Sequence, residues 1–210
     1  DDLTGKTVCK ADLQKRLGLA LDHDAALVGC TSRLATQKGI DLLIAAARDL
    51  DLLGLGCQFA ILGEGDPDME RQLTDLAVSN PERFAYTRGY DEALAHRIQA
   101  GADLFLVPSR YEPCGLTQMY ALRYGTVPVV RAVGGLDDTI EDVAEDGYGY
   151  KFSEASPEAL SDALRRAVDQ FADRVAWRRL MELAMTLDFT WDRPARMYES
   201  LYREVEALRA

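Results

Sequence analysis

The sequence has few of the residues that build metal sites and disulfide frameworks. Its 210 residues include four cysteines, with no Cys-x-x-Cys pair among them, and two histidines, His23 and His96. This composition excludes a finger-like zinc site and a small fold held together by disulfides. We therefore expect reduced thiols, no metal, no cofactor and a cytoplasmic location.

Long hydrophobic runs and an excess of positive charge are also missing. The longest apolar stretches fall well short of the ~18 residues that a membrane-spanning helix needs. The formal net charge is −11, from 35 acidic and 24 basic residues, and this field repels the phosphates of a nucleic acid. We expect neither a membrane nor a nucleic acid as partner, whereas a small anion can bind where local arginine and lysine outweigh the global charge.

The first residues lack both an initiating methionine and the features of a secretion signal. They read DDLTGK, which is acidic and polar rather than basic and then apolar. We interpret the chain as a piece of a longer protein.

Short apolar runs alternate with amphipathic segments along most of the chain. The strand candidates are ALVGC (26–30), CQFAIL (57–62), RFAYT (83–87), LFLVP (104–108), VPVVR (127–131) and YGYKF (148–152). Helical patterns cover residues 10–19, about 40–53, 67–79, 91–101, 115–125 and 136–144. Buried strands separated by helices predict an α/β fold, a doubly wound, mostly parallel Rossmann-like sheet of about six strands with helices on both faces.

The C-terminal part has only helical patterns. Ser156, Pro157 and Glu158 follow the order of an N-cap, a first-turn proline and a first-turn acid. Helices are expected to about residue 172, over about 174–186 and from Thr190 or Trp191 to about 207. We assign residues 1–189 to one domain and residues 190–210 to a separate C-terminal helix.

Ligands of open parallel sheets bind at the carboxyl ends of the strands, which directs attention to residues 31–39, 63–67, 87–91, 108–117 and 131–138. The first of these loops carries Arg33 and Lys38, a planar donor fork and a mobile point charge that suit a diphosphate. The same pair also fits a solvated loop, because the segment is no Walker motif.

The loop PSRYEPCGLTQ (108–118) is the most informative segment. Gly115 allows close approach of a ligand to the backbone, and the free N–H groups of the helix that follows favour an anion or a hydroxyl. Glu112 suits sugar hydroxyls, or equally a first-turn acid that complements the helix dipole. Cys114 fits a small residue in a tight turn better than a nucleophile.

Two further loops carry candidate ligand contacts. Tyr90 follows the third strand, where it either stacks on a base or covers an edge of the core. Gly134 and Gly135 fit a phosphate-binding nest or an ordinary tight turn. His96 falls in the middle of a predicted helix and receives no role. GEGD (63–66) lacks the full dinucleotide fingerprint.

Four segments together resemble the C-terminal domain of ADP-glucose-dependent bacterial glycogen synthases. They are SRLATQKGIDLL, GYDEALAHRIQAGAD, PSRYEPCGLTQMYALRYGTVPVVR and VGGLDDT. The resemblance implies a retaining glycosyltransferase of two Rossmann-like domains, the GT-B arrangement, with this chain as the donor-binding half.

The resemblance also implies a role for each candidate residue. Arg33 and Lys38 would bind the donor diphosphate, Tyr90 would stack on adenine, and Glu112 would face the glucose hydroxyls. Backbone N–H groups would contact the sugar and the distal phosphate from Cys114, Gly115, Leu116 and Thr117. Residues 190–210 would cross to the other domain and leave Trp191, Met197 and neighbouring apolar side chains partly exposed here. The alternative is that this segment folds onto its own sheet.

The sequence departs from the family's pattern in three places. Tyr120 stands where many retaining relatives carry a second glutamate, which is in keeping with the glycogen-synthase branch. Val133 replaces a threonine and its hydroxyl. The Lys-x-Gly-Gly-Leu motif of the acceptor-side domain does not occur. Two alternatives therefore stay open, a hexosyltransferase that uses UDP-glucose and a non-catalytic nucleotide-binding α/β module.

Overall fold

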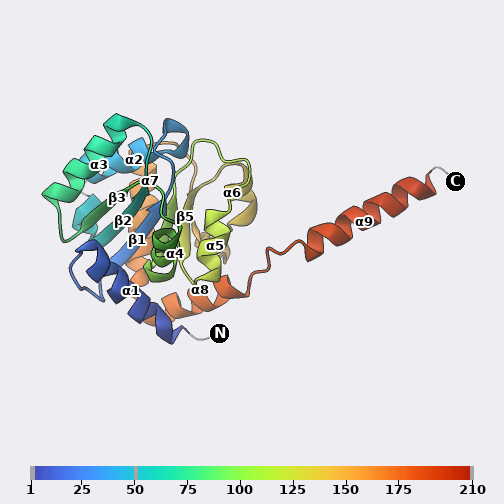
Figure 1. Cartoon of the computed structure of the whole chain (residues 1–210). Coiled ribbons are helices and arrows are strands. Elements are labelled where there is room, and N and C mark those ends of the chain that lie inside the picture. Colours follow the sequence, from blue (N-terminus) through green and yellow to red (C-terminus); the bar gives the residue numbers. More distant parts are fainter. Residues whose placement is uncertain (1–2, 50–51, 209–210) are drawn as a thin grey trace.

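Six parallel strands form one central sheet in the computed structural model, which describes residues 3–49 and 52–208 (Figure 1). Their order is β3-β2-β1-β4-β5-β6. Their bounds are β1 Ala26–Thr31, β2 Cys57–Gly63, β3 Phe84–Arg88, β4 Leu104–Val107, β5 Val127–Arg131 and β6 Tyr150–Phe152. The chain builds outward from β1 in one direction and then from β4 in the other. This doubly wound order confirms the predicted fold class.

The central strands are buried on both faces, as their continuous apolar runs predict. Every residue of β2 and the first five residues of β1 are buried. β1 pairs with β4 through Val28 opposite Leu104 and Gly29 opposite Phe105. Because the two strands run parallel in this register, the loops that follow them leave the sheet side by side.

Helices cover both faces of the sheet and divide its core into two layers. Side chains of α2, α3 and α7 pack on one face, and those of α1, α4, α5 and α6 pack on the other. α8 borders both layers, since Trp177 belongs to the first and Ala184 to the second. The helix bounds are α1 Thr4–Leu17, α2 Ile40–Asp49, α3 Pro67–Ser79, α4 Glu92–Gly101, α5 Thr117–Arg123, α6 Gly134–Thr139, α7 Pro157–Phe171, α8 Arg174–Thr186 and α9 Asp192–Ala207.

α3 and α7 begin where the sequence offers a side-chain cap. Asp66 accepts hydrogen bonds from the N–H groups of Asp68 and Met69, with Pro67 in the first turn of α3. Ser156 caps α7 through the N–H of Ala159. Each cap satisfies N–H groups that a helix start leaves without a partner. Both starts agree with the predicted ones.

Several predicted boundaries are wrong by a few residues. α1 spans Thr4–Leu17 instead of 10–19 and ends on Gly18, which has a left-handed conformation. α5 starts two residues later than predicted and ends at Arg123. The segment predicted over 136–144 is two short helices, α6 and the 3₁₀ turn Val143–Glu145. The predicted helix over 40–53 ends at Asp49, and residues 50–51 of that prediction lie outside the described residues.

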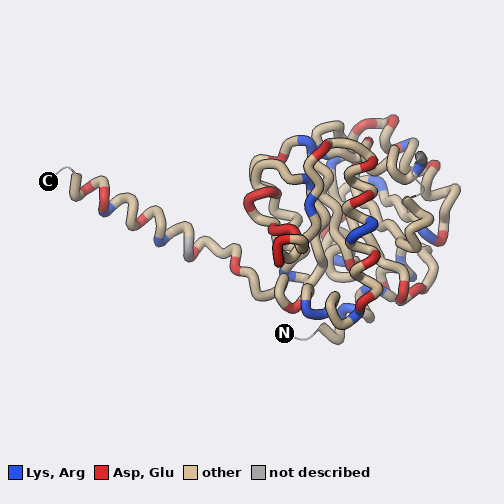
Figure 2. Tube along the Cα trace, turned by 180° about the vertical axis from the view of Figure 1, so that it is seen from behind, with Lys and Arg blue, Asp and Glu red and all other residues tan. Residues whose placement is uncertain are grey.

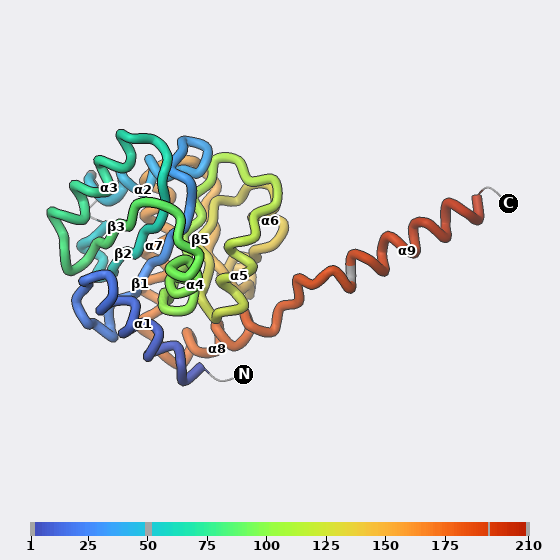
Figure 3. Tube along the Cα trace, in the orientation of Figure 1, coloured from blue at the N-terminus to red at the C-terminus, as the bar shows by residue number. Residues whose placement is uncertain are grey.

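The last helix, α9, extends away from the rest of the chain (Figures 1 and 3). Of its described side chains only that of Pro194 is even half-buried, and Trp191, Met197 and Tyr202 are 75%, 64% and 63% exposed. The alternative in which this segment folds onto its own sheet is therefore wrong.

Charged residues of both signs are spread along the chain. Figure 2 shows basic and acidic positions interspersed over the body and along α9. Within residues 3–49 and 52–208, no helix is long and apolar enough to cross a membrane.

Candidate functional site

The candidate site lies where the order of the sheet reverses, between the loops that follow β1 and β4. Open α/β sheets bind ligands in the crevice at this switch point. The two loops contact each other directly: the N–H of Arg110 donates to the carbonyl of Gln37 (2.8 Å), and Gln37 Nε2 donates to the carbonyl of Tyr111 (3.2 Å).

A cavity of about 190 Å³ opens at this point, and most of its polar lining comes from the two loops. Its polar residues are Thr31, Ser32, Arg33, Lys38, Ser109, Glu112 and Thr117. Two cations and a single carboxylate stand among the described lining residues, so the cavity is locally positive in an acidic chain. Arg33, Lys38 and Glu112 thus come together as predicted, although the two loops are far apart in the sequence.

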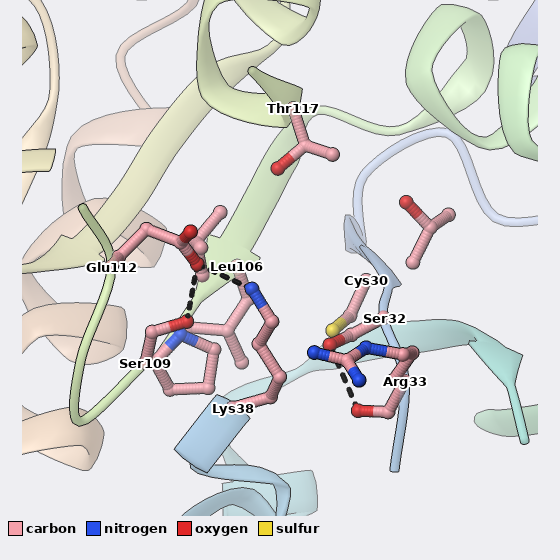
Figure 4. Close-up of a pocket in the computed structure, with 11 residues that line it drawn as sticks. Cys30, Ser32, Arg33, Lys38, Leu106, Ser109, Glu112 and Thr117 are labelled. Atoms are coloured by element: carbon pink, nitrogen blue, oxygen red, sulfur yellow. Dashed lines mark hydrogen bonds and ion pairs between the residues drawn. The ribbon is translucent and has the colours of Figure 1, made fainter. Parts of the chain in front are cut away.

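Lys38 and Glu112 form an ion pair inside this cavity. Lys38 Nζ lies 2.6 Å from Glu112 Oε2, and Ser109 Oγ donates to the same oxygen at 3.1 Å. Figure 4 shows both groups directed at the carboxylate, with Arg33 approaching from the end of β1. None of the ion pairs among the described residues uses Arg33, whose side chain is exposed and available to a ligand.

Glu112 does not belong to a helix. Because α5 begins only at Thr117 and has no acid in its first turn, the alternative in which Glu112 is a first-turn acid of that helix is wrong. Its carboxylate is instead held by Lys38 and Ser109 at the cavity wall.

Two arginines, Arg110 and Arg131, hold the loop after β4 in place. Arg110 forms a two-point ion pair with Asp41, with distances of 2.6 and 2.8 Å. Arg131 donates to the carbonyls of Ser109 (3.0 Å) and Arg110 (2.6 Å). Planar guanidinium groups suit such multiple contacts, so the loop that carries Glu112 is braced before any ligand arrives.

The next residues of this loop present unused hydrogen-bond donors. None of the hydrogen bonds among the described residues takes the N–H of Cys114, Gly115, Leu116 or Thr117, and no side chain caps α5. Unpaired N–H groups are uncommon unless water or a ligand satisfies them. The predicted backbone contacts therefore have donors in place.

Gly134 and Gly135 pack against the same loop. A Cβ at Gly134 would collide with the carbonyl oxygen of Glu112, and one at Gly135 with that of Cys114. The N–H of Gly135 already donates to the Glu112 carbonyl at 3.0 Å. The glycines thus allow α6 to touch the loop backbone, and their direct contact with a ligand stays a prediction.

A larger cavity of about 560 Å³ continues from the inner one and shares Thr31, Ser32, Arg33 and Thr117 with it. Tyr90 stands at its edge with 82% of its surface exposed. Such exposure contradicts the alternative in which Tyr90 covers an edge of the core. A cleft of this size and mixed lining is typical of small-molecule sites.

The sequence patterns missed several lining residues. Glu92, Ala95, His96 and Gln99 line the larger cavity from one face of α4, and their 3–4-residue spacing was the available signal. His96 Nδ1 lies 3.0 Å from the hydroxyl of Tyr124. Ser109 is almost fully buried and was marked only by its position directly after a buried strand.

The cysteine that lines the inner cavity is not a reactive thiol. Cys30 lies at the inner cavity, where burial raises the pKa of its thiol to about 12, which keeps it protonated at neutral pH. Across the described parts of the chain, no group of His, Cys, Asp or Glu is arranged to hold a metal ion.

Comparison with known proteins defines the class. The family model described as "Glycosyl transferases group 1" matches residues 14–179, so the chain belongs to this family. Its relatives include glycogen synthases: the chain is 52% identical to the glycogen synthase of Anaeromyxobacter sp. (strain Fw109-5) over 98% of its own length and 43% of the relative's. It is 47% identical to that of Thioalkalivibrio sulfidiphilus, covering 98% of this chain and 44% of the relative.

Solved structures agree with this relationship. The catalytic domain of starch synthase IV from Arabidopsis thaliana, bound to ADP and acarbose, superposes with a TM-score of 0.87 at 40% identity, over 97% of this chain and 43% of that one. Sucrose-phosphate synthase from Thermosynechococcus elongatus gives 0.64 at 27% identity, over 94% of this chain and 49% of that one. The chain spans less than half the length of its curated relatives. These similarities confirm the resemblance to glycogen synthases and the assignment to one half of a GT-B fold.

Proposed function

We propose that this chain is the donor-binding domain of a retaining glucosyltransferase, which transfers glucose from ADP-glucose to the growing end of an α-1,4-glucan in the cytoplasm. The observation that carries the proposal is the convergence of Arg33, Lys38 and Glu112 in one cavity beside the unused N–H groups of residues 114–117. This cavity combines positive charge, a carboxylate and backbone donors, which are the groups that recognise a sugar diphosphate.

The lining of the inner cavity favours transfer over glycosidase-type hydrolysis. A glycosidase uses two carboxyl groups about 5–10 Å apart, whereas Glu112 is the single carboxylate among the described residues of the inner cavity. Arg33 and Lys38 would instead stabilise the charge that develops on the departing ADP. Glu112 would accept hydrogen bonds from the glucose hydroxyls.

Adenine as the base has support from Tyr90 and from the ADP bound to the starch synthase IV structure. An exposed tyrosine at the cleft edge provides a flat face for stacking. UDP-glucose is the competing donor, and titration of the chain with ADP and UDP by calorimetry distinguishes the two. Comparable affinities would remove the assignment of ADP-glucose as donor.

The acceptor glucan is expected to bind to a second domain outside this chain. The exposed apolar side of α9, together with a chain length under half that of the relatives, supports a crossing of α9 onto that domain. We therefore expect the isolated chain to bind ADP and ADP-glucose at millimolar concentration without elongating glycogen. Elongation by the isolated chain would overturn this division of roles.

A chimera separates this proposal from a non-catalytic nucleotide-binding module. Joining the chain to the acceptor-side half of a related glycogen synthase should restore elongation if Glu112 and the cations belong to an active site. A chimera that binds ADP-glucose but stays inactive would favour the module.

A further inference from the structure

We infer that Gln118 is a positioning residue, which turns the N–H groups of Gly115 and Leu116 toward the sugar diphosphate. The inference rests on the proposed function and adds to it a residue that touches no ligand itself. Gln118 is the second residue of α5, and none of its surface is exposed.

The side-chain amide of Gln118 donates hydrogen bonds to two carbonyl groups of the loop that precedes α5. Its Nε2 lies 3.0 Å from the carbonyl oxygen of Gly115 and 3.3 Å from that of Cys114. The opposite orientation of the amide would place Oε1 against two carbonyl oxygens, so hydrogen bonding fixes the assignment. Both carbonyls are therefore drawn to the buried side of the loop.

The geometry of the peptide bond then fixes the direction of the N–H groups of Gly115 and Leu116. The described chain has no cis peptide bond, and in a trans peptide the C=O and the following N–H point in opposite directions. The carbonyls of Cys114 and Gly115 share their peptide planes with the N–H groups of Gly115 and Leu116. Holding the carbonyls inward directs these two N–H groups outward, and neither of them has a partner.

A third contact joins this arrangement to α6. Gln118 Nε2 also lies 3.1 Å from Thr139 Oγ1, and Thr139 in turn donates to the carbonyl of Gly135 at 2.5 Å. Gly135 packs on the carbonyl of Cys114. One buried amide thus connects the loop that carries Glu112 with α6, which carries the glycine pair.

Stability alone does not account for an amide at this position. Gln118 Oε1 is buried and has no hydrogen-bond partner among the described residues. A buried unsatisfied acceptor destabilises a fold, whereas an apolar side chain of similar size avoids that cost. Gly115 is adapted to the same amide: its φ is +72°, and a Cβ there would lie 2.6 Å from Gln118 Oε1. The hydrogen bonds of Nε2, and not a gain in stability, therefore account for an amide at position 118.

The test compares ligands that reach the loop with one that does not. Calorimetry on Gln118→Met should show that the affinities for ADP-glucose and ADP fall about tenfold, which is the effect of losing one or two hydrogen bonds to charged or polar groups. The affinity for AMP should be unchanged. A ratio of ADP-glucose to AMP affinity equal to that of the unmodified chain would overturn the inference. Failure of the unmodified chain to bind ADP-glucose would instead overturn the proposed function.

Gln58→Met is the matched control. Gln58 is also buried, and its Nε2 also donates to two backbone carbonyls, those of Ala20 (2.8 Å) and Glu82 (3.1 Å), but it lines neither cavity of the site. It should lose stability and keep the ratio. An equal change of ratio in both variants would show that Gln118 acts only through general stability.

Thr139 supplies a milder variant in case Gln118→Met does not fold. Thr139→Val should lower the ADP-glucose to AMP ratio about twofold, since it removes one acceptor of the amide. Thr139→Ser keeps the hydroxyl and should restore the ratio. Identical ratios in both Thr139 variants would count against the inference.

Discussion

Lys38 Nζ lies 2.6 Å from Glu112 Oε2, so the cation expected to hold the donor phosphate and the carboxylate expected to face its sugar are each other's partner without a ligand. Both side chains are largely buried, with 20% and 11% of their surfaces exposed. The pair keeps two largely buried charges compensated. In the proposed complex the phosphate binds Lys38 and the sugar binds Glu112, so donor binding competes with this ion pair.

Neutralising Glu112 should therefore separate the contributions of phosphate and sugar. In Glu112→Gln, Lys38 loses its competing anion, and we expect ADP to bind about threefold to tenfold more tightly. The additional affinity that glucose gives to ADP-glucose should disappear. Calorimetric titration with both ligands checks this, with Asp68→Asn, which removes a surface ion pair with Arg71, as control. Weaker ADP binding by Glu112→Gln would contradict the prediction.

Replacing the two cations should affect phosphate and little else. Arg33→Ala and Lys38→Ala are each expected to weaken ADP about tenfold or more, since charge-assisted hydrogen bonds are the strong ones. Adenosine, without phosphates, should bind as before. Arg71→Ala, an exposed arginine on α3, should change neither. Equal losses for ADP and adenosine would argue against phosphate contacts.

Tyr90 should contribute to nucleotide affinity but not to stability. Stacking of a base on an aromatic ring is worth about 1–3 kcal/mol, so Tyr90→Ala should weaken ADP about fivefold to a hundredfold. Because the side chain is 82% exposed, the thermal midpoint should stay the same. Tyr202→Ala on α9 serves as control for a lost exposed tyrosine. A large drop in the midpoint of Tyr90→Ala would show that the residue has a structural role.

Acid should weaken the fold partly through Asp142. Burial raises the pKa of this carboxyl, but hydrogen bonds from Arg166 and from the N–H groups of Ala144 and Lys151 outweigh burial and bring the pKa below the ordinary 3.8. A depressed carboxyl pKa stabilises the folded state above the unfolded pKa, and this stability is lost as pH falls through the folded one.

The corresponding variant is Asp142→Asn. At pH 7 its free energy of unfolding should be about 1–3 kcal/mol lower than that of the unmodified chain, and the difference should narrow as pH falls below about 4. Urea titrations over this range measure it. Glu182→Gln, which loses only an exposed helical pair with Arg178, should cost about 0.5 kcal/mol or less. A difference for Asp142→Asn that does not change with pH would refute the electrostatic explanation.

Removing α9 should leave the domain intact. Since the described side chains of this helix are exposed apart from the half-buried Pro194, a chain that ends at residue 189 should keep its thermal midpoint. It should also associate less at high concentration, because the exposed apolar side of α9 favours self-association. Sedimentation and thermal melts of both chains test this. A markedly lower midpoint would show that α9 stabilises the domain.

The sequence predicts best where one local signal decides the outcome. Buried strands such as β2 follow from continuous apolar runs, and α3 follows from the cap of Asp66 and Pro67. The early start of α1 was missed because no capping side chain marks it: Leu3, at its start, makes no side-chain cap hydrogen bond. α5 begins later because Gly115, with its positive φ, and the packing of α6 hold residues 112–116 in a loop.

The candidate site combines local and tertiary information. Arg33, Lys38 and Glu112 could be predicted to share a site, since their loops leave the carboxyl ends of parallel strands. The pairing of Lys38 with Glu112 could not, because it depends on how two loops 74 residues apart pack together. The exposure of Tyr90 likewise depends on the course of the chain after β3. Tertiary packing determines such details, and the hydrophobic periodicity of the sequence does not predict that packing.

The outward course of α9 affects which substitutions this helix can accept in evolution. Its 16 residues span roughly 24 Å, enough to reach well across a neighbouring body. If its apolar side is covered there, substitutions on that side will be neutral for the stability of this domain and will be selected for their fit to the covering surface. The apolar residues of α9 would then vary together with the residues that they contact, while the sheet evolves under its own constraints.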